Sequence, residues 1–209
     1  MKSLQELYLN KDYQSLTEQL VKSREAFTDD AYYYNLGTVK FKQGDIAAAR
    51  YYFEKSLSSG NFSSSLLHNL FVTNKNLQTS VYEEPVVYTD YLYQYSSLYP
   101  MEVYLMLSLI LVTIIASFKK FFSKNVLLAS ITISFIPFLL GLYGDQFVKK
   151  AIVMEEAKLR EGPSQIFSES TLVPSGLKII LGKEVDGWFY IESPVKFSGW
   201  VKKESIGIL

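Results

Sequence analysis

The sequence contains no cysteine among its 209 residues and only one histidine, His68. A chain without thiols forms no disulfide, no cysteine-based metal site and no thiol nucleophile. A single imidazole also argues against a histidine-ligated metal centre. The 21 basic residues balance the 21 acidic ones, whereas a nucleic-acid-binding protein carries a basic face or stripe. We therefore expect no cofactor, no bound metal and no nucleic-acid partner.

Catalytic motifs are missing as well. The sequence shows no phosphate-binding loop, no cluster of metal ligands and no nucleophile beside a base. The first 20 residues, MKSLQELYLNKDYQSLTEQL, have no apolar segment and do not resemble a signal peptide. These absences predict a protein that is not an enzyme.

Charge is missing from two long apolar runs, Val103 to Phe118 and Asn125 to Gly144. As helices, runs of 16 and 20 residues are about 24 and 30 Å long, and a bilayer core is about 30 Å thick. The pattern predicts a two-helix transmembrane hairpin over residues 101–144, in contact with membrane lipid. The alternative is a pair of buried helices in a soluble protein, which would need a large core around them.

The sequence around these runs predicts an orientation. The connection from Lys119 to Lys124 carries three lysines, whereas the flank before the first run is acidic and has no Lys or Arg after Lys75. The positive-inside rule places such a turn in the cytoplasm. We therefore expect both soluble parts on one side of a bacterial inner membrane, the periplasmic side. A tyrosine-rich interfacial linker is expected over residues 81–100.

Residues 1–80 show helical periodicity and a repeat at an offset of 33 residues, which aligns Asp45 with Asp12. The second copy resembles the tetratricopeptide repeat (TPR). The residues at that family's spacing are Tyr33, Leu36, Gly37, Gly44, Ala49 and Phe53. A small residue at position 37 would let two helices approach closely, and Gly44 would end the first helix in a left-handed conformation. We therefore expect a TPR-like helical repeat domain here.

The resemblance to this family implies a concave face that binds a protein partner. Its residues would be Tyr34, Thr38, Phe41 and Lys42 from the second copy, followed by His68, Val72 and Lys75 from the next. The alternative is that these side chains are solvated or packed on the linker. Partner binding at this face is a prediction of the resemblance.

Residues 148–209 contain short apolar segments separated by turns, which predicts a small all-β barrel. The segment resembles the bacterial SH3 domain, and the pieces that carry the resemblance are Leu159 to Ser164, Gly176 to Leu181, Asp186 to Trp188 and Gly199 to Val201. A groove binds cell-wall peptides in some members of that family. The resemblance therefore implies a candidate ligand surface of Phe167, Tyr190, Phe197 and Trp200. Alternatively, the tryptophans only seal the small core.

The predicted fold class is a multidomain membrane protein: an all-α TPR-like helical repeat, a two-helix transmembrane hairpin and an all-β SH3-like small barrel. This order resembles the BatE-type proteins of bacterial Bat (aerotolerance) systems. It implies a non-catalytic scaffold or adaptor in a hetero-oligomeric inner-membrane complex, serving oxidative-stress tolerance or envelope-protein maturation. The implied partners are von Willebrand A-domain (VWA) membrane proteins and, indirectly, a MoxR-type ATPase. The alternative is an envelope sensor or cell-wall-binding protein that reads a ligand with the barrel.

Overall fold

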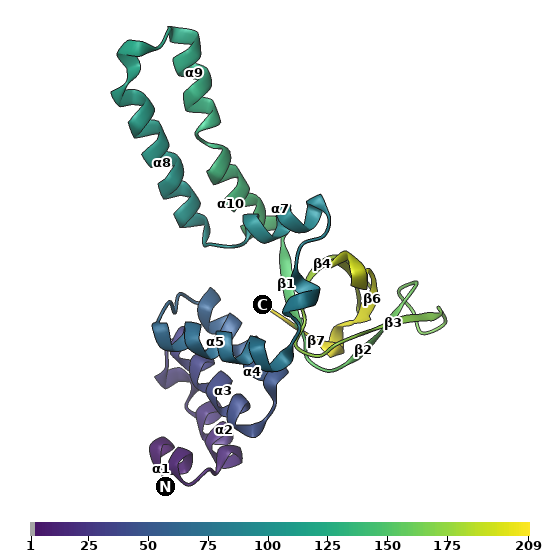
Figure 1. The fold of residues 1–209 in the computed structure, drawn as a ribbon. Helices are drawn as coiled ribbons and strands as arrows, with labels where there is room; N and C mark the ends of the chain where they lie inside the picture. Colours follow the sequence, from purple (N-terminus) through teal and green to yellow (C-terminus); the bar gives the residue numbers. More distant parts are fainter. Residues whose placement is uncertain (1–2) are drawn as a thin grey trace. The chain divides into compact units, whose positions relative to one another are not determined.

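The computed structural model describes residues 3–209 (Figure 1). The α-helices are α1 (Leu4–Leu9), α2 (Tyr13–Lys22), α3 (Asp29–Gln43), α4 (Ile46–Ser58), α5 (Ser64–Leu77), α6 (Ser80–Glu83), α7 (Tyr88–Ser96), α8 (Met101–Ser117), α9 (Lys124–Ile133) and α10 (Ile136–Phe147). The strands are β1 (Lys149–Val153), β2 (Ala157–Arg160), β3 (Glu169–Val173), β4 (Lys178–Val185), β5 (Trp188–Ser193), β6 (Gly199–Lys202) and β7 (Ile206–Ile208). Short 3-10 turns occur at Arg24–Ala26, Lys119–Phe121, Val195–Phe197 and Lys203–Ser205.

The chain forms two compact units. Unit 1 combines the described residues up to Glu84 with Lys150–Leu209, and unit 2 is Pro85–Lys149. Unit 1 therefore contains helices α1–α6 together with the sheet, whereas unit 2 contains α7–α10. The chain leaves unit 1 once and returns to it once.

Helix starts in unit 1 follow the repeated aspartates. The carboxylate of Asp12 accepts a hydrogen bond from the Ser15 amide at 3.2 Å, and that of Asp45 accepts one from the Ala48 amide at 3.1 Å. Each side chain satisfies an amide that has no partner within its helix. Helix α3 ends at Gly44, whose φ of 83° is the left-handed conformation expected there.

Helices α3 and α4 approach closely at Gly37. A Cβ atom at this position would lie 2.5 Å from the ring of Phe53, which is 1% exposed. Two hydrophobic clusters fill the helical part of unit 1. One is centred on Leu16, Leu20 and Leu36, and the other combines Phe53 with Ala49, Leu66 and Leu70.

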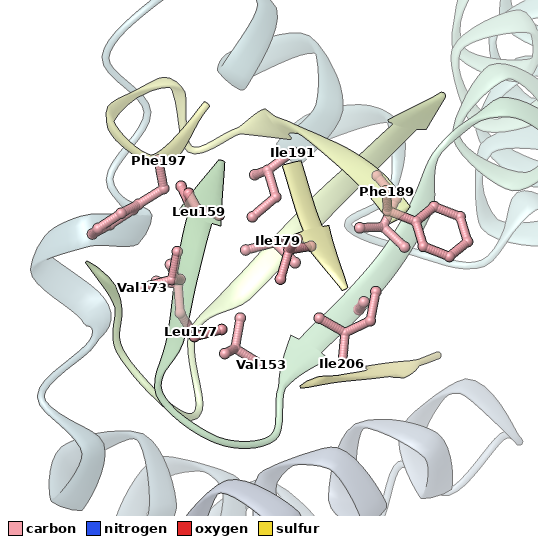
Figure 2. Packing of buried hydrophobic residues seen from close by; sticks show 13 residues of the cluster. Val153, Leu159, Val173, Leu177, Ile179, Phe189, Ile191, Phe197 and Ile206 are labelled. Carbon is pink, nitrogen blue, oxygen red and sulfur yellow. The ribbon is translucent and has the colours of Figure 1, made fainter. Parts of the chain in front are cut away.

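A single antiparallel sheet of seven strands completes unit 1, in the order β3-β2-β6-β5-β4-β1-β7. Strands β4 and β5 meet at a two-residue turn, Asp186 and Gly187, which have φ angles of 48° and 79°. Positive φ at both positions gives a hairpin turn whose twist matches that of the strands. Alternate side chains point inward and form a third cluster, in which Leu159, Ile179 and Ile191 lie together (Figure 2).

A buried charge network joins the helices of unit 1 to the sheet. Arg50 of α4 is 2% exposed. Its guanidinium donates to both carboxylate oxygens of Glu83, at 2.5 and 2.8 Å, to the Thr79 hydroxyl at 3.1 Å and to the Gly176 carbonyl at 2.8 Å. Lys178 of β4 donates to Glu54 at 2.8 Å, and Glu54 also lies 3.9 Å from Arg50. We call Arg50, Glu54, Thr79, Glu83 and Lys178 the Arg50 network.

Electrostatics inside the network favours the charged forms. Burial by itself would raise the pKa of Glu54, but the charges of Lys178 and Arg50 outweigh it and hold that pKa below its ordinary value. Burial by itself would lower the pKa of Arg50, but its hydrogen bond with Glu83 and the charges of Glu83 and Glu54 raise that pKa. Both shifts favour the charged forms of Glu54 and Arg50.

Unit 2 is held by close contacts between its helices. A Cβ at Gly144 of α10 would lie 1.9 Å from the Ser96 carbonyl oxygen of α7, so only glycine fits there. Helix α9 ends at Ile133 and helix α10 begins at Ile136, so the helical stretch is interrupted between them. Near the start of α10, the Phe138 amide donates a hydrogen bond to the Ser108 hydroxyl of α8 at 3.0 Å. Outward-facing side chains of unit 2 are mostly large and apolar, among them Ile110 at 52%, Phe121 at 83% and Leu128 at 67% exposure.

The predicted fold class is wrong. Only the stretch Lys124–Phe147 is by itself long and apolar enough to cross a membrane among residues 3–209. Helix α8 has 17 residues and qualifies only together with α7, from which it is bent by 89°. The predicted transmembrane pair is therefore not found, because a turn at Pro100 separates α7 from α8.

The two units follow other boundaries than the predicted TPR-like and SH3-like domains. Helices α1–α6 and the sheet belong to one unit, in which the Arg50 side chain donates a hydrogen bond to the backbone carbonyl of Gly176, 126 residues further along the chain. The expected linker 81–100 is divided, with residues 81–84 in unit 1 and 85–100 in unit 2. The described part of 1–80 and almost all of 148–209 fall together in unit 1, whereas 101–144 lies within unit 2.

Substituting Gly37 tests the helix crossing. We expect Gly37→Ala to destabilise the full chain by about 1–3 kcal/mol, because the added methyl group overpacks against the Phe53 ring. Gln43→Ala, an exposed change in the same helix, should cost less than about 0.5 kcal/mol. Denaturant unfolding in detergent, followed by circular dichroism, measures both. Equal stability of the two variants would show that the crossing is looser than described.

Acidification tests the network. Because the pKa of Glu54 is lowered on folding, its stabilising contribution is complete above pH 4.5 and disappears as the pH falls through the lower folded-state value. We expect Glu54→Gln to lose about 1.5–3 kcal/mol at pH 7 and to show a flatter acid decline than the wild type. Glu184→Gln, at a surface ion pair with Lys203, is the control and should keep the wild-type decline. Parallel pH profiles for Glu54→Gln and the wild type would contradict this account.

Candidate partner-binding cavity

A cavity of about 360 Å³ opens among the helices of unit 1. Four of its helices contribute side chains: α1, α3, α4 and α5. The lining residues are Tyr8, Tyr34, Thr38, Phe41, Lys42, Phe53, His68, Asn69 and Val72. Four of the nine lining residues are Tyr or Phe, and Lys42 and His68 are exposed.

Helical spacing explains why these residues meet. Tyr34, Thr38, Phe41 and Lys42 follow one another at intervals of four, three and one, which places them on one face of α3. His68 and Val72 are four residues apart on α5 and share a face in the same way. Six of the lining residues therefore come from one face of α3 and one face of α5.

The walls of the cavity are held by local contacts. The Tyr34 hydroxyl accepts a hydrogen bond from the Asn69 amide group at 3.3 Å, which links α3 to α5. Tyr34 also lies against Phe53, with the ring centroids 6.0 Å apart. The Thr38 hydroxyl donates to the Tyr34 carbonyl at 2.9 Å, so its methyl group is fixed in orientation. These contacts give a preformed cavity.

The charge around the cavity has one sign. Lys42 is a cation, and no carboxylate is among the lining residues. Among residues 3–209, none of the ion pairs involves Lys42. The cavity is thus complementary to an apolar group that carries a carboxylate.

Six of the seven side chains expected on a concave face lie around this one cavity. The exception is Lys75, which is exposed on α5 and is not a lining residue. Sequence reasoning missed Tyr8, Phe53 and Asn69. Phe53 is one of the residues at the TPR spacing, and Asn69 stands next to His68, but nothing in the sequence indicates that α1 brings Tyr8 to this place.

The second predicted surface, on the sheet, is only partly assembled. Tyr190 and Trp200 are half-buried and pack edge to face, with centroids 5.5 Å apart. Phe167 is 42% exposed in the connection between β2 and β3. Phe197 does not belong to a surface: it is 3% exposed and lies in the sheet core, with Tyr82 against its ring.

Metal chemistry has no visible support. Within the part of the chain that the structure describes, no group of three or more His, Asp or Glu side chains could hold a metal ion. The arrangement at the cavity suits binding through rings and one cation. No family model, curated protein or solved structure matches this chain, so the cavity is interpreted from its own geometry.

Proposed function

We propose that this chain is a non-catalytic adaptor that binds a segment of a protein partner in the cavity of unit 1 and attaches to a membrane through unit 2. The observation that carries the proposal is the cavity itself, with its aromatic side chains and with Lys42, which forms no ion pair within the described residues 3–209. The bound segment presents an apolar side chain close to an Asp or Glu carboxylate.

The size of the cavity supports a short segment. Ligand pockets span about 300–1,000 Å³, and 360 Å³ lies at the small end of that range. Four aromatic residues line it, and aromatic pairs contribute about 0.5–1.5 kcal/mol beyond the area that they bury. One or two side chains of a partner would fill such a space, which suits a binding protein whose affinity is increased by attachment to the same membrane.

The surface of unit 2 supports attachment to lipid. Its helices expose many large apolar side chains, and only 11% of the most apolar window in Lys124–Phe147 is buried. The turn between α8 and α9 carries Lys119, Lys120 and Lys124, while tyrosines are concentrated in α7. Lysine and tyrosine are typical of the headgroup layer. Both flanks of unit 2 continue into unit 1.

The VWA-domain membrane proteins and the MoxR-type ATPase stay predictions of the resemblance to Bat systems. The adaptor role is favoured over the alternative cell-wall reader by one observation. Phe197, one of the four residues expected to bind a cell-wall ligand, is buried. In contrast, six of the seven residues expected to bind a protein partner line one cavity.

Site-specific photo-crosslinking tests partner binding. Benzoylphenylalanine replaces Val72, which lines the cavity, or its neighbour Phe71, which is 67% exposed on α5 and does not. We expect an adduct from position 72 and none from position 71. Lys42→Glu should reduce the adduct about tenfold, equivalent to ~1.4 kcal/mol, because it repels the carboxylate of the partner. Lys22→Glu, an exposed lysine of α2, is the matched control.

Mass spectrometry of the adduct should place the crosslink beside an Asp or Glu in one partner protein. Equal adducts from positions 71 and 72, or insensitivity to Lys42→Glu, would contradict the proposed binding site. Such a result would leave the membrane attachment unaffected, because that is measured separately.

Lipid contact is tested with single cysteines, which are unique labels because the chain has none. We expect a bimane label at Leu128 of α9 to be quenched by nitroxide lipids in reconstituted vesicles. The label at Phe62 of unit 1, with 58% exposure against 67% for Leu128, should not be quenched. Equal quenching at the two positions, or none at Leu128, would show that unit 2 does not lie in lipid.

A further inference from the structure

The helical part and the sheet of unit 1 do not share a hydrophobic core. Within residues 3–209, each of the three buried clusters draws its side chains from one part alone. Where the two parts touch, Leu77 lies against Gly176 and Tyr51 against Gly207, so apolar side chains meet the backbone of the sheet. The Arg50 network lies between the two parts and supplies charged hydrogen bonds.

A short segment, residues 79–83, fastens this junction, and we call it the strap. Its Thr79 hydroxyl and Glu83 carboxylate both accept hydrogen bonds from Arg50 of α4. On the sheet side, Glu83 accepts one from the Lys178 amide at 3.1 Å. The ring of Tyr82 meets Phe197 edge to face at 5.4 Å, and the Lys196 ammonium lies 4.4 Å from its centroid. The strap therefore contacts both parts through side chains.

The position of the strap in the chain gives it a further property. Helix α5, which supplies three cavity residues, ends at Leu77, and the strap follows after Gln78. Unit 2 begins at Pro85, directly after the strap and Glu84. The strap therefore lies, along the chain, between the last residue of α5 and the first residue of unit 2.

We infer that the strap is a releasable latch, which holds the helical part on the sheet when Glu83 is bound to Arg50 and lets the two parts separate when it is not. Each part keeps its own hydrophobic core after separation, and the freed guanidinium is hydrated by water. The open and closed arrangements share the three hydrophobic clusters and differ in the charge network and in the contacts of Leu77, Tyr51 and Tyr82, and the network decides between them. Its release frees the end of the cavity helix α5 where the chain passes into unit 2.

Spin-label distance measurements on the full chain in detergent test the latch. Labels are placed on cysteines introduced at Ser65 of α5 and Lys183 of β4, both exposed, in a chain without other cysteines. The wild type should give a single narrow distance distribution. We expect Glu83→Gln to add a second population shifted to longer distances, with an unchanged circular dichroism spectrum. Glu83→Asp, which retains the charge on a shorter side chain, should show a smaller second population.

Glu169→Gln is the matched control, because Glu169 also pairs with two cations, Lys158 and Arg160, but within the sheet alone. It should leave the distribution as in the wild type. A wild-type distribution in Glu83→Gln would overturn the latch, and so would equal broadening in Glu169→Gln. Both outcomes are independent of crosslinking at the cavity, which addresses the proposed function.

Discussion

The buried guanidinium of Arg50 is the group on which the arrangement of unit 1 depends. Arg50 lies in helix α4. Its guanidinium donates hydrogen bonds to Glu83 of the strap and to the carbonyl of Gly176, which lies in the turn before β4, more than a hundred residues further along the chain. Removing one partner from a buried ion pair costs about 3–5 kcal/mol, because a charge is left without compensation. Without a hydrophobic core common to both parts, this network is what fixes helices and sheet as one unit.

The two proposed functions are assigned to different parts of the molecule. The cavity is enclosed by α1, α3, α4 and α5, whose own clusters keep it formed, and its binding groups are rings and one cation. Unit 2 has a different character, with apolar side chains facing outward and polar groups such as Ser108 satisfied inside. That pattern is expected of helices in lipid, where every polar group needs a partner within the protein. Partner binding and membrane attachment are thus assigned to separate surfaces.

Local features were predictable from the sequence, and long-range ones were not. Gly44 and the capping aspartates act within one turn of a helix, so their residue types indicate their roles. Spacing of three and four residues also brought most of the expected cavity side chains together. The fold class failed because composition does not reveal the turn at Pro100 or the assembly of distant segments into unit 1. Arg50 reads as a surface residue of an amphipathic helix, and Phe197 as an exposed aromatic, because the groups that bury them are remote in sequence.

The central claim is that the ion pair of Arg50 and Glu83 joins the two parts of unit 1. A double-mutant cycle with Arg50→Met, Glu83→Gln and the combined variant measures this directly, as free energies of unfolding of the full chain in detergent. The account predicts a coupling of about 0.5–3 kcal/mol, the range found for residues in one network. Additivity within about 0.3 kcal/mol would contradict it, because the two side chains would then stabilise the protein independently.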